Sequence, residues 1–349
     1  MKTLTKPLLA ILGLLISLNV FSQDDAKSLV ARGVALNDSG KYAEALATYQ
    51  LAIKANPHYS NAYYEYAYTL FVTGKGTDAV PYLEKVIKLD PTAGGGFDML
   101  GSIYDDNKQP DKAIEYYRQG IKVDPDYQRL HFNLAVLYLR QDKNKEAEAC
   151  AIDAIKLDPK HASSQRVYAL ATYNQNRFAP SIMAFCSFLL LEPQSQRSNE
   201  AFGYIQKIIQ SRVKINADSG AKKSVTIYVQ DNKSTDEDER ALEMIVAMAA
   251  ATPTLDKNKN KTPNELLTEQ LETIFKTAGE LSSKRKTKDF FWKYYADYFY
   301  KLAQSENMPA FTRLVSLSAY KEENIKWFNE NDSKLKDLNH WVSTTDLNF

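Results

Sequence analysis

The segments Ile87-Lys-Leu-Asp-Pro91 and Ile121-Lys-Val-Asp-Pro125 decide the fold of this chain, because closely similar segments recur at a fixed interval. The chain has five such segments: Ile53–Pro57, Ile87–Pro91, Ile121–Pro125, Ile155–Pro159 and Leu189–Pro193. The prolines that end them are separated by four consecutive intervals of 34 residues. A proline disfavours the helical conformation at the residue before it, so each segment is expected to end a helix. The chain is therefore predicted to contain five consecutive copies of one helical element.

Each copy has the residue pattern of two packed helices. Apolar residues recur at helical spacing, as Phe97, Leu100 and Tyr104 do in the third copy. Small residues stand at the eighth and twentieth positions, where Gly101 and Ala113 let two antiparallel helices approach closely. One copy cannot bury its apolar face alone, so residues 26–193 are expected to stack into a solenoid.

The third copy also carries the residues of a known family. Its aromatic residue, Leu-Gly pair, tyrosine, alanine, second aromatic residue, small residue and proline resemble the tetratricopeptide repeat, a helix-turn-helix element of 34 residues. The resemblance implies an all-α fold with a right-handed superhelix of about five repeats. The fifth copy is degraded, since Ser181 and Phe188 replace small alanines, as is typical of a terminal repeat.

The first residues have the pattern of an export signal. Lys2 and Lys6 precede an apolar run that ends at Val20, and Ser22 offers a small residue for cleavage. We expect residues 1–22 to be a signal peptide and the mature chain to be periplasmic in a bacterium, with secretion as the second choice. The alternative is an uncleaved anchor, but the run is shorter than the roughly 20 apolar residues that span a bilayer.

Two further regions follow the repeats. Residues 195–233 are predicted to form a capping helix, at Ser198–Val213, and an irregular connector. In the connector, Val225–Val229 has the composition of a short strand, but no partner strand is evident, so an extended loop packed on helices is the favoured prediction. Residues 234–349 are predicted to form a C-terminal helical domain, with capping boxes at Ser234–Glu237 and Thr262–Glu265. Eight aromatic residues between Phe290 and Tyr300 predict an aromatic core there.

Composition and motifs argue against most chemical functions. With 44 basic and 43 acidic residues, the net charge of +1 disfavours a nucleic-acid partner, whose binding depends on neutralising phosphates. The sequence has no G-x-S-x-G, H-E-x-x-H or C-x-x-C motif and no phosphate-binding loop. We expect no enzymatic activity, no cofactor and no metal. Three features leave alternatives open. Gly94–Gly96 is a flexible junction or an anion-binding segment. Lys284–Lys288 is a solvated loop or a site for an acidic partner or lipid headgroups. Cys150 and Cys186 are buried thiols or a disulfide.

The resemblance implies a concave groove lined by the first helix of each repeat. Its second, fifth, ninth and twelfth positions would point inward. The candidate partner-binding residues among them are Tyr64, Tyr68, Phe71, Asp98, Asp105, Arg129, Phe132, Arg166 and Tyr173. Aromatic and arginine side chains are common anchors at protein interfaces, and charged ones add register and selectivity. The alternative is that the C-terminal domain fills this groove.

These patterns predict an exported, non-catalytic scaffold that binds a segment of another protein of the envelope or of secretion, with no membrane span in the mature chain. The alternative is a glycan- or peptidoglycan-binding accessory protein that uses the tyrosine-rich groove. Some relatives of this family hold a partner's terminal carboxylate with a Lys/Asn/Lys/Arg clamp. That clamp is absent here, where the matching positions hold Val30, Val34, Glu65, Gly95 and Met99.

Overall fold

The computed structural model describes residues 25–216, 224–228 and 236–346. The predicted signal peptide at 1–22 and the predicted cap Ser234 lie outside these residues. Among the residues described, no helix combines the length and the apolar composition needed to cross a bilayer.

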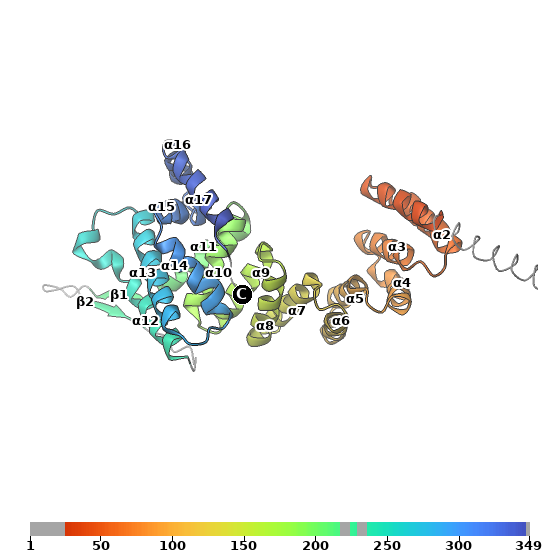
Figure 1. Ribbon diagram of the computed structural model, residues 1–349, viewed down its shortest axis with the longest axis horizontal. Helices are drawn as coiled ribbons and strands as arrows, with labels where there is room; N and C mark the ends of the chain where they lie inside the picture. Colours follow the sequence, from red (N-terminus) through yellow and green to blue (C-terminus); the bar gives the residue numbers. More distant parts are fainter. Residues whose placement is uncertain (1–24, 217–223, 229–235, 347–349) are drawn as a thin grey trace, which may run out of the picture. The chain divides into compact units, whose positions relative to one another are not determined.

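Ten helices occupy residues 25–191 and alternate as the first and second helices of five repeats (Figure 1). They are the helix over 25–38 and α2 (Tyr42–Ala55), α3 (Ser60–Val72) and α4 (Gly76–Leu89), α5 (Gly94–Asp106) and α6 (Pro110–Val123), α7 (Gln128–Arg140) and α8 (Asn144–Leu157), and α9 (Ala162–Asn174) and α10 (Phe178–Leu191). Every second helix ends two residues before a repeat proline, as α4 does before Pro91. The all-α, tetratricopeptide-type prediction is confirmed.

The chain divides into two compact units, which we call the N-terminal unit (residues 1–137) and the C-terminal unit (residues 138–349). The core of the N-terminal unit joins the first three repeats through fully buried residues such as Tyr49, Leu83 and Leu100. Two glycines allow this packing. A Cβ at Gly33 would overlap the ring of Tyr49, and one at Gly101 would overlap the ring of Tyr117.

The C-terminal unit is built around α10, most of whose residues are buried. The elements after α10 are α11 (Gln196–Gln210), β1 (Val213–Asn216), β2 (Ser224–Ile227), α12 (Glu237–Ala249), η1 (Thr252–Thr254), η2 (Asp256–Asn258), α13 (Pro263–Lys284), the π-helix η3 (Phe291–Ala296), α14 (Asp297–Ala303), α15 (Met308–Val315), α16 (Lys321–Glu330) and α17 (Asp332–Thr344). Helix α10 contacts α11, α12, η3 and α15. The predicted aromatic core is present, since Trp292, Tyr295, Phe299 and Phe311 are fully buried.

Two local predictions were wrong. The segment around Val225 is not an unpaired loop, because β2 pairs antiparallel with β1 and Val213 lies opposite Ile227. The partner strand was hidden because Val213 was assigned to the preceding helix, which ends at Gln210. The N-cap of α12 is Asp236, whose carboxylate accepts hydrogen bonds from the backbone N–H of Asp238 and Glu239. The capping box between Thr262 and Glu265 at α13 is confirmed.

Candidate functional site

In the N-terminal unit, the candidate residues lie on one face of the first helices. Positions 2, 5, 9 and 12 recur at helical spacing, so Tyr64, Tyr68 and Phe71 share a side of α3. The Tyr68 side chain is exposed, whereas Tyr64 and Phe71 are half-buried, and both pack against the core of this unit. Tyr68 is thus the aromatic residue of α3 most available to a partner.

Two charged candidates, Asp98 on α5 and Arg129 on α7, form an ion pair. Oδ2 of Asp98 lies 3.1 Å from a terminal guanidinium nitrogen of Arg129, and Asn133 donates a hydrogen bond of 2.7 Å to Oδ1. Asp98 is 2% exposed, whereas the Arg129 side chain is 63% exposed. Burial raises the pKa of Asp98, while Arg129 and Asn133 act in the opposite direction. The buried carboxylate of Asp98 therefore fixes the position of the exposed guanidinium of Arg129.

Tyr64 of α3 lies close to the ion pair of Asp98 and Arg129. Its ring lies over the backbone of α5, since a Cβ at Gly95 would be 3.3 Å from it. Burial raises the pKa of Tyr64 to about 12, as does the neighbouring Tyr127, while the charge of Arg129 opposes the shift. Tyr64 is thus an uncharged hydrogen-bonding group at neutral pH. We call Tyr64, Asp98, Arg129 and Asn133 the arginine subsite.

Two other candidates of this unit lie outside the subsite. Asp105, on the last turn of α5, and Phe132, on α7, are both half-buried. Sequence reasoning did not select Asn133 or Tyr127, which belong to the surroundings of Arg129. Neither occupies an inward-pointing repeat position, so the sequence pattern offered no signal for them.

In the C-terminal unit, Arg166 and Tyr173 of α9 face α11. Arg166 forms an ion pair of 3.0 Å with Glu200, and the ring of Tyr173 makes an edge-to-face contact with Tyr204 at 4.8 Å between centroids. The ammonium of Lys207 lies 5.7 Å from the centre of the Tyr173 ring. The candidate face therefore continues from α9 onto α11.

Helix α11 occupies the place of the first helix of a sixth repeat. Gln196 follows Ala162 by 34 residues, which sets Glu200, Tyr204 and Lys207 at inward positions. The segment is predicted to cap the last repeat, and the same 34-residue spacing also assigns it the register of a sixth first helix. In the described part of the chain, α11 is followed by β1 and β2 instead of a second helix.

The later helices of the C-terminal unit contact α9 through other positions. The side chain of Gln165 bonds the hydroxyls of Tyr294, at 2.8 Å, and Tyr295, at 2.5 Å. The ring of Tyr168 stacks on Tyr295 at 5.2 Å. Gln165 and Tyr168 occupy positions 4 and 7 of the repeat. The later helices therefore contact α9 at different positions from α11, which contacts positions 5 and 12.

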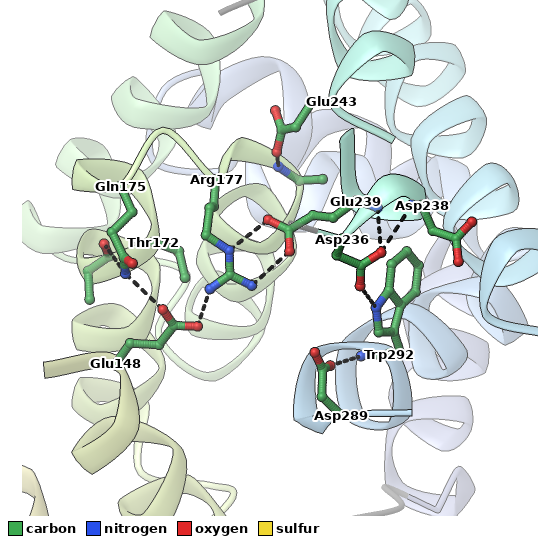
Figure 2. A network of polar contacts seen from close by, with 12 residues as sticks. Glu148, Thr172, Gln175, Arg177, Asp236, Asp238, Glu239, Glu243, Asp289 and Trp292 are labelled. Carbon is green, nitrogen blue, oxygen red and sulfur yellow. Dashed lines mark hydrogen bonds and ion pairs between the residues drawn. The ribbon is translucent and has the colours of Figure 1, made fainter. Parts of the chain in front are cut away.

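A buried polar network joins α10 to α12 and is drawn in Figure 2. Arg177 donates to both carboxylate oxygens of Glu239, at 2.6 and 3.1 Å, and to Glu148 of α8. Four residues further along α12, Glu243 accepts a hydrogen bond of 2.8 Å from the backbone N–H of Ala179. Burial raises the pKa of Glu243 to about 7. One helix of the C-terminal region thus supplies two carboxylates to the start of α10.

The basic loop that follows α13 also contributes to this unit. Arg285 binds Asp236 at 2.7 Å and Asp238 at 2.6 Å, and its guanidinium lies 4.5 Å from the centre of the Trp292 ring. Lys288 binds Asp297 at 2.7 Å. Two of its basic side chains are therefore engaged within the protein.

The described residues offer little for catalysis. No group of three or more His, Cys, Asp or Glu residues is placed to hold a metal ion in the part of the chain that the structure describes. Both cysteines are thiols; Cys150 is half-buried, and complete burial raises the pKa of Cys186. A raised thiol pKa disfavours the reactive thiolate.

Comparisons with known proteins agree with the helix pairs. Two family models, both described as tetratricopeptide repeat, match residues 30–94 and 106–171. The chain is 38% identical over 99 residues to Hsp70-Hsp90 organizing protein 1 of Glycine max, which is 28% of this chain and 17% of the relative. It is 26% identical over 124 residues to the TPR repeat-containing protein YpiA of Bacillus subtilis, which is 36% of this chain and 29% of YpiA. The chain thus spans less than a third of the length of either relative.

Solved structures of repeat proteins are similar as well. PilF of Pseudomonas aeruginosa covers 54% of this chain and 91% of its own, with 15% identity and a TM-score of 0.48. YrrB, described as a TPR protein with an unusual peptide-binding site, covers 51% of this chain and 92% of its own, with 18% identity and a TM-score of 0.42. Together, the 34-residue period, the observed helix pairs and both family models show that the chain contains tetratricopeptide repeats over residues 30–94 and 106–171.

Proposed function

We propose that this protein is an exported, non-catalytic scaffold of a bacterial cell envelope that binds a segment of a partner protein on the first-helix face of its repeats. The observation that carries the proposal is the arginine subsite, where a largely exposed Arg129 is fixed by a buried Asp98. Arginine and aromatic side chains in such settings are frequent anchors of protein interfaces. The wider family supports a protein-binding role in general terms.

The chemistry of the subsite indicates what such a segment would contain. A guanidinium carries five N–H donors in a planar fork, and Asp98 engages it through one terminal nitrogen. The remaining donors suit a carboxylate or a backbone carbonyl of the partner. Tyr68, at 39% exposure, adds an apolar surface with a hydroxyl on the same face. We therefore propose an extended segment with an acidic residue next to an apolar one.

Export is proposed from residues 1–22, where two lysines precede the apolar run and Ser22 provides a small residue. We expect the mature protein to begin at Gln23 and to lie in the periplasm, with secretion as the second choice. Fractionation of the native host, followed by N-terminal sequencing, tests this. Recovery of a chain that still begins at Met1 in the membrane fraction would favour the anchor instead.

The partner proposal is tested by co-purification from envelope extracts. Tyr68→Ala/Arg129→Ala removes two exposed groups from the proposed face, and Tyr42→Ala removes a tyrosine of similar exposure, 42%, from the second helix α2. We expect the double variant to lose the partner and Tyr42→Ala to keep it. Equal recovery in all three proteins would refute the assignment of the face. Calorimetry with peptidoglycan fragments tests the glycan alternative, which predicts heat that the double variant abolishes.

A further inference from the structure

A cavity lies where the second helix of the sixth repeat would pack. The side of α11 that such a helix would cover carries Phe202, Gln206 and Ile209. The end of α12, the start of α13 and Tyr320 close over this side and leave a cavity of about 310 Å³. This volume is about twice that of a 150 Å³ cavity that is known to bind benzene, so a ligand with two fused rings would fit.

The floor of the cavity is apolar and its mouth is open to solvent. Phe202, Ile209, Ala250 and Leu267 line it and are all buried. Gln210, Pro253 and Pro263 also line it but are exposed, which places them at the rim. A ligand could therefore enter without opening the core.

The polar groups of the cavity are uncharged and directional. Among the described residues that line it, none is acidic or basic. The amide N–H of Gln206 donates to the Tyr320 hydroxyl at 3.1 Å, and that of Gln270 donates to the carbonyl of Ala249 at 3.2 Å. Both side chains use an N–H within the protein, which leaves their carbonyl oxygens as acceptors for a ligand.

We propose that this cavity binds a small uncharged group with a flat apolar body, about the size of indole, that carries an N–H or O–H donor. A charged ligand is disfavoured because it would lose its hydration without gaining an ionic partner. A purely apolar ligand would leave the carbonyl oxygens of Gln206 and Gln270 without the donor that they suit. A free small molecule and an aromatic side chain presented by a partner share this chemistry.

The probe that tests the proposal is indole itself, titrated into the mature chain and followed by ligand-observed NMR. Leu266 is half-buried and lines the cavity, so Leu266→Trp should fill it and weaken indole binding at least about tenfold. Leu255→Trp is the matched control, because Leu255 is 46% exposed and does not line this cavity. If Leu266→Trp does not fold, Gln210→Trp at the exposed rim replaces it.

The outcomes are distinct. Saturable binding to wild type and to Leu255→Trp, with loss in the filled variant and weaker binding of 1-methylindole and indole-3-acetate, supports the proposal. An absence of saturable binding to wild type, or equal binding to the filled variant, overturns it. Native mass spectrometry of protein from its own host then distinguishes the sources, since only a free small molecule adds mass without a partner chain. This site shares no residue with the arginine subsite, so either proposal can fail alone.

Discussion

Gly101 of α5 lies directly against the ring of Tyr117 of α6, so that a Cβ at this glycine would come within 3.0 Å of three ring atoms. The residues at positions 8 and 24 vary together along the repeats. The pairs are Gly33 with Tyr49, Ala67 with Leu83, Gly101 with Tyr117, Ala135 with Ala151 and Ala169 with Phe185. Among these pairs, glycine occurs only where position 24 is tyrosine, whereas the Phe185 ring is paired with an alanine. In both glycine pairs the tyrosine ring lies so close that it leaves no room for a Cβ.

Gly101→Ala should therefore destabilise the N-terminal unit, by about 1–3 kcal/mol, because an added methyl group in a packed core forces neighbouring atoms apart. The cost should vanish in a Tyr117→Leu background, which reproduces the Ala67 and Leu83 pair of the second repeat. Urea unfolding of the four proteins of this cycle measures the coupling. A similar cost in both backgrounds would show that the ring is not the cause.

Gly203 provides the opposite case at the same repeat position. A Cβ there meets no atom within 4 Å, since the sixth repeat lacks a second helix. Gly203→Ala should stabilise the C-terminal unit by about 0.5–1 kcal/mol, the usual gain from replacing glycine inside a helix. Thermal unfolding of the wild type and of Gly203→Ala measures this difference in stability. A loss of stability would show that a Cβ at Gly203 does meet a neighbouring atom in the folded protein.

Arg177→Ala should destabilise the C-terminal unit by about 3–5 kcal/mol, because it leaves Glu148 and Glu239 buried without their cation. All three tryptophans lie in this unit, so tryptophan fluorescence in urea follows its unfolding. The control is Lys336→Ala, which breaks an exposed pair with Asp332 and should change stability by at most about 1 kcal/mol. Equal effects of the two changes would contradict a structural role for the network.

The stability of the C-terminal unit should fall as pH rises from about 4.5 to about 7. Glu243 has an ordinary pKa of 4.5 when unfolded and a pKa of about 7 in the fold, mainly because of burial. The folded state therefore binds more protons than the unfolded state in this window, and rising pH favours unfolding. Backbone N–H groups and Arg212 favour the ionised form, and Glu239 opposes it.

Glu243→Gln mimics the protonated form and can still accept the hydrogen bond from Ala179. It should raise stability at pH 8 by up to about 3 kcal/mol and leave it nearly unchanged at pH 4.5. Urea unfolding at both values measures this, with Glu280→Gln on an exposed face of α13 as the control. An unaltered pH dependence in Glu243→Gln would show that folding does not raise the pKa of this carboxyl.

Asp98→Asn distinguishes the role of Asp98 in positioning Arg129 from any role of Asp98 in the stability of the fold. It removes a buried charge, so stability should change by no more than about 1 kcal/mol. It also removes the anion that fixes Arg129, so recovery of the partner should fall nearly as far as in Arg129→Ala. Wild-type recovery by Asp98→Asn would mean that the ion pair does not position Arg129 for binding.

The repeats were predictable from the sequence because each is encoded locally. Prolines such as Pro91 and Pro125 mark where second helices end, and the spacing of Phe97, Leu100 and Tyr104 marks a buried helix face. These signals need no knowledge of distant residues. The fold class and the helix pairs followed from them.

The contacts between distant segments were not predictable in the same way. Arg177 and Glu239 lie 62 residues apart, and no local pattern distinguishes them from other charged residues. The pairing of Asp98 with Arg129 was equally hidden, because both occupy inward positions and were expected to face a partner. The strand pair was missed through an error of three residues in a helix end, since α11 stops at Gln210 rather than at Val213.

Site-specific photocrosslinking in intact cells of the native host determines whether the first-helix face of the repeats contacts a partner. A photoreactive amino acid would replace Tyr68 on this face or, as the control, Tyr42 on α2. We expect a crosslinked partner at position 68, with a lower yield in Arg129→Ala, and no crosslinked partner at position 42. Crosslinks of equal yield at both positions, or at position 42 alone, would contradict it.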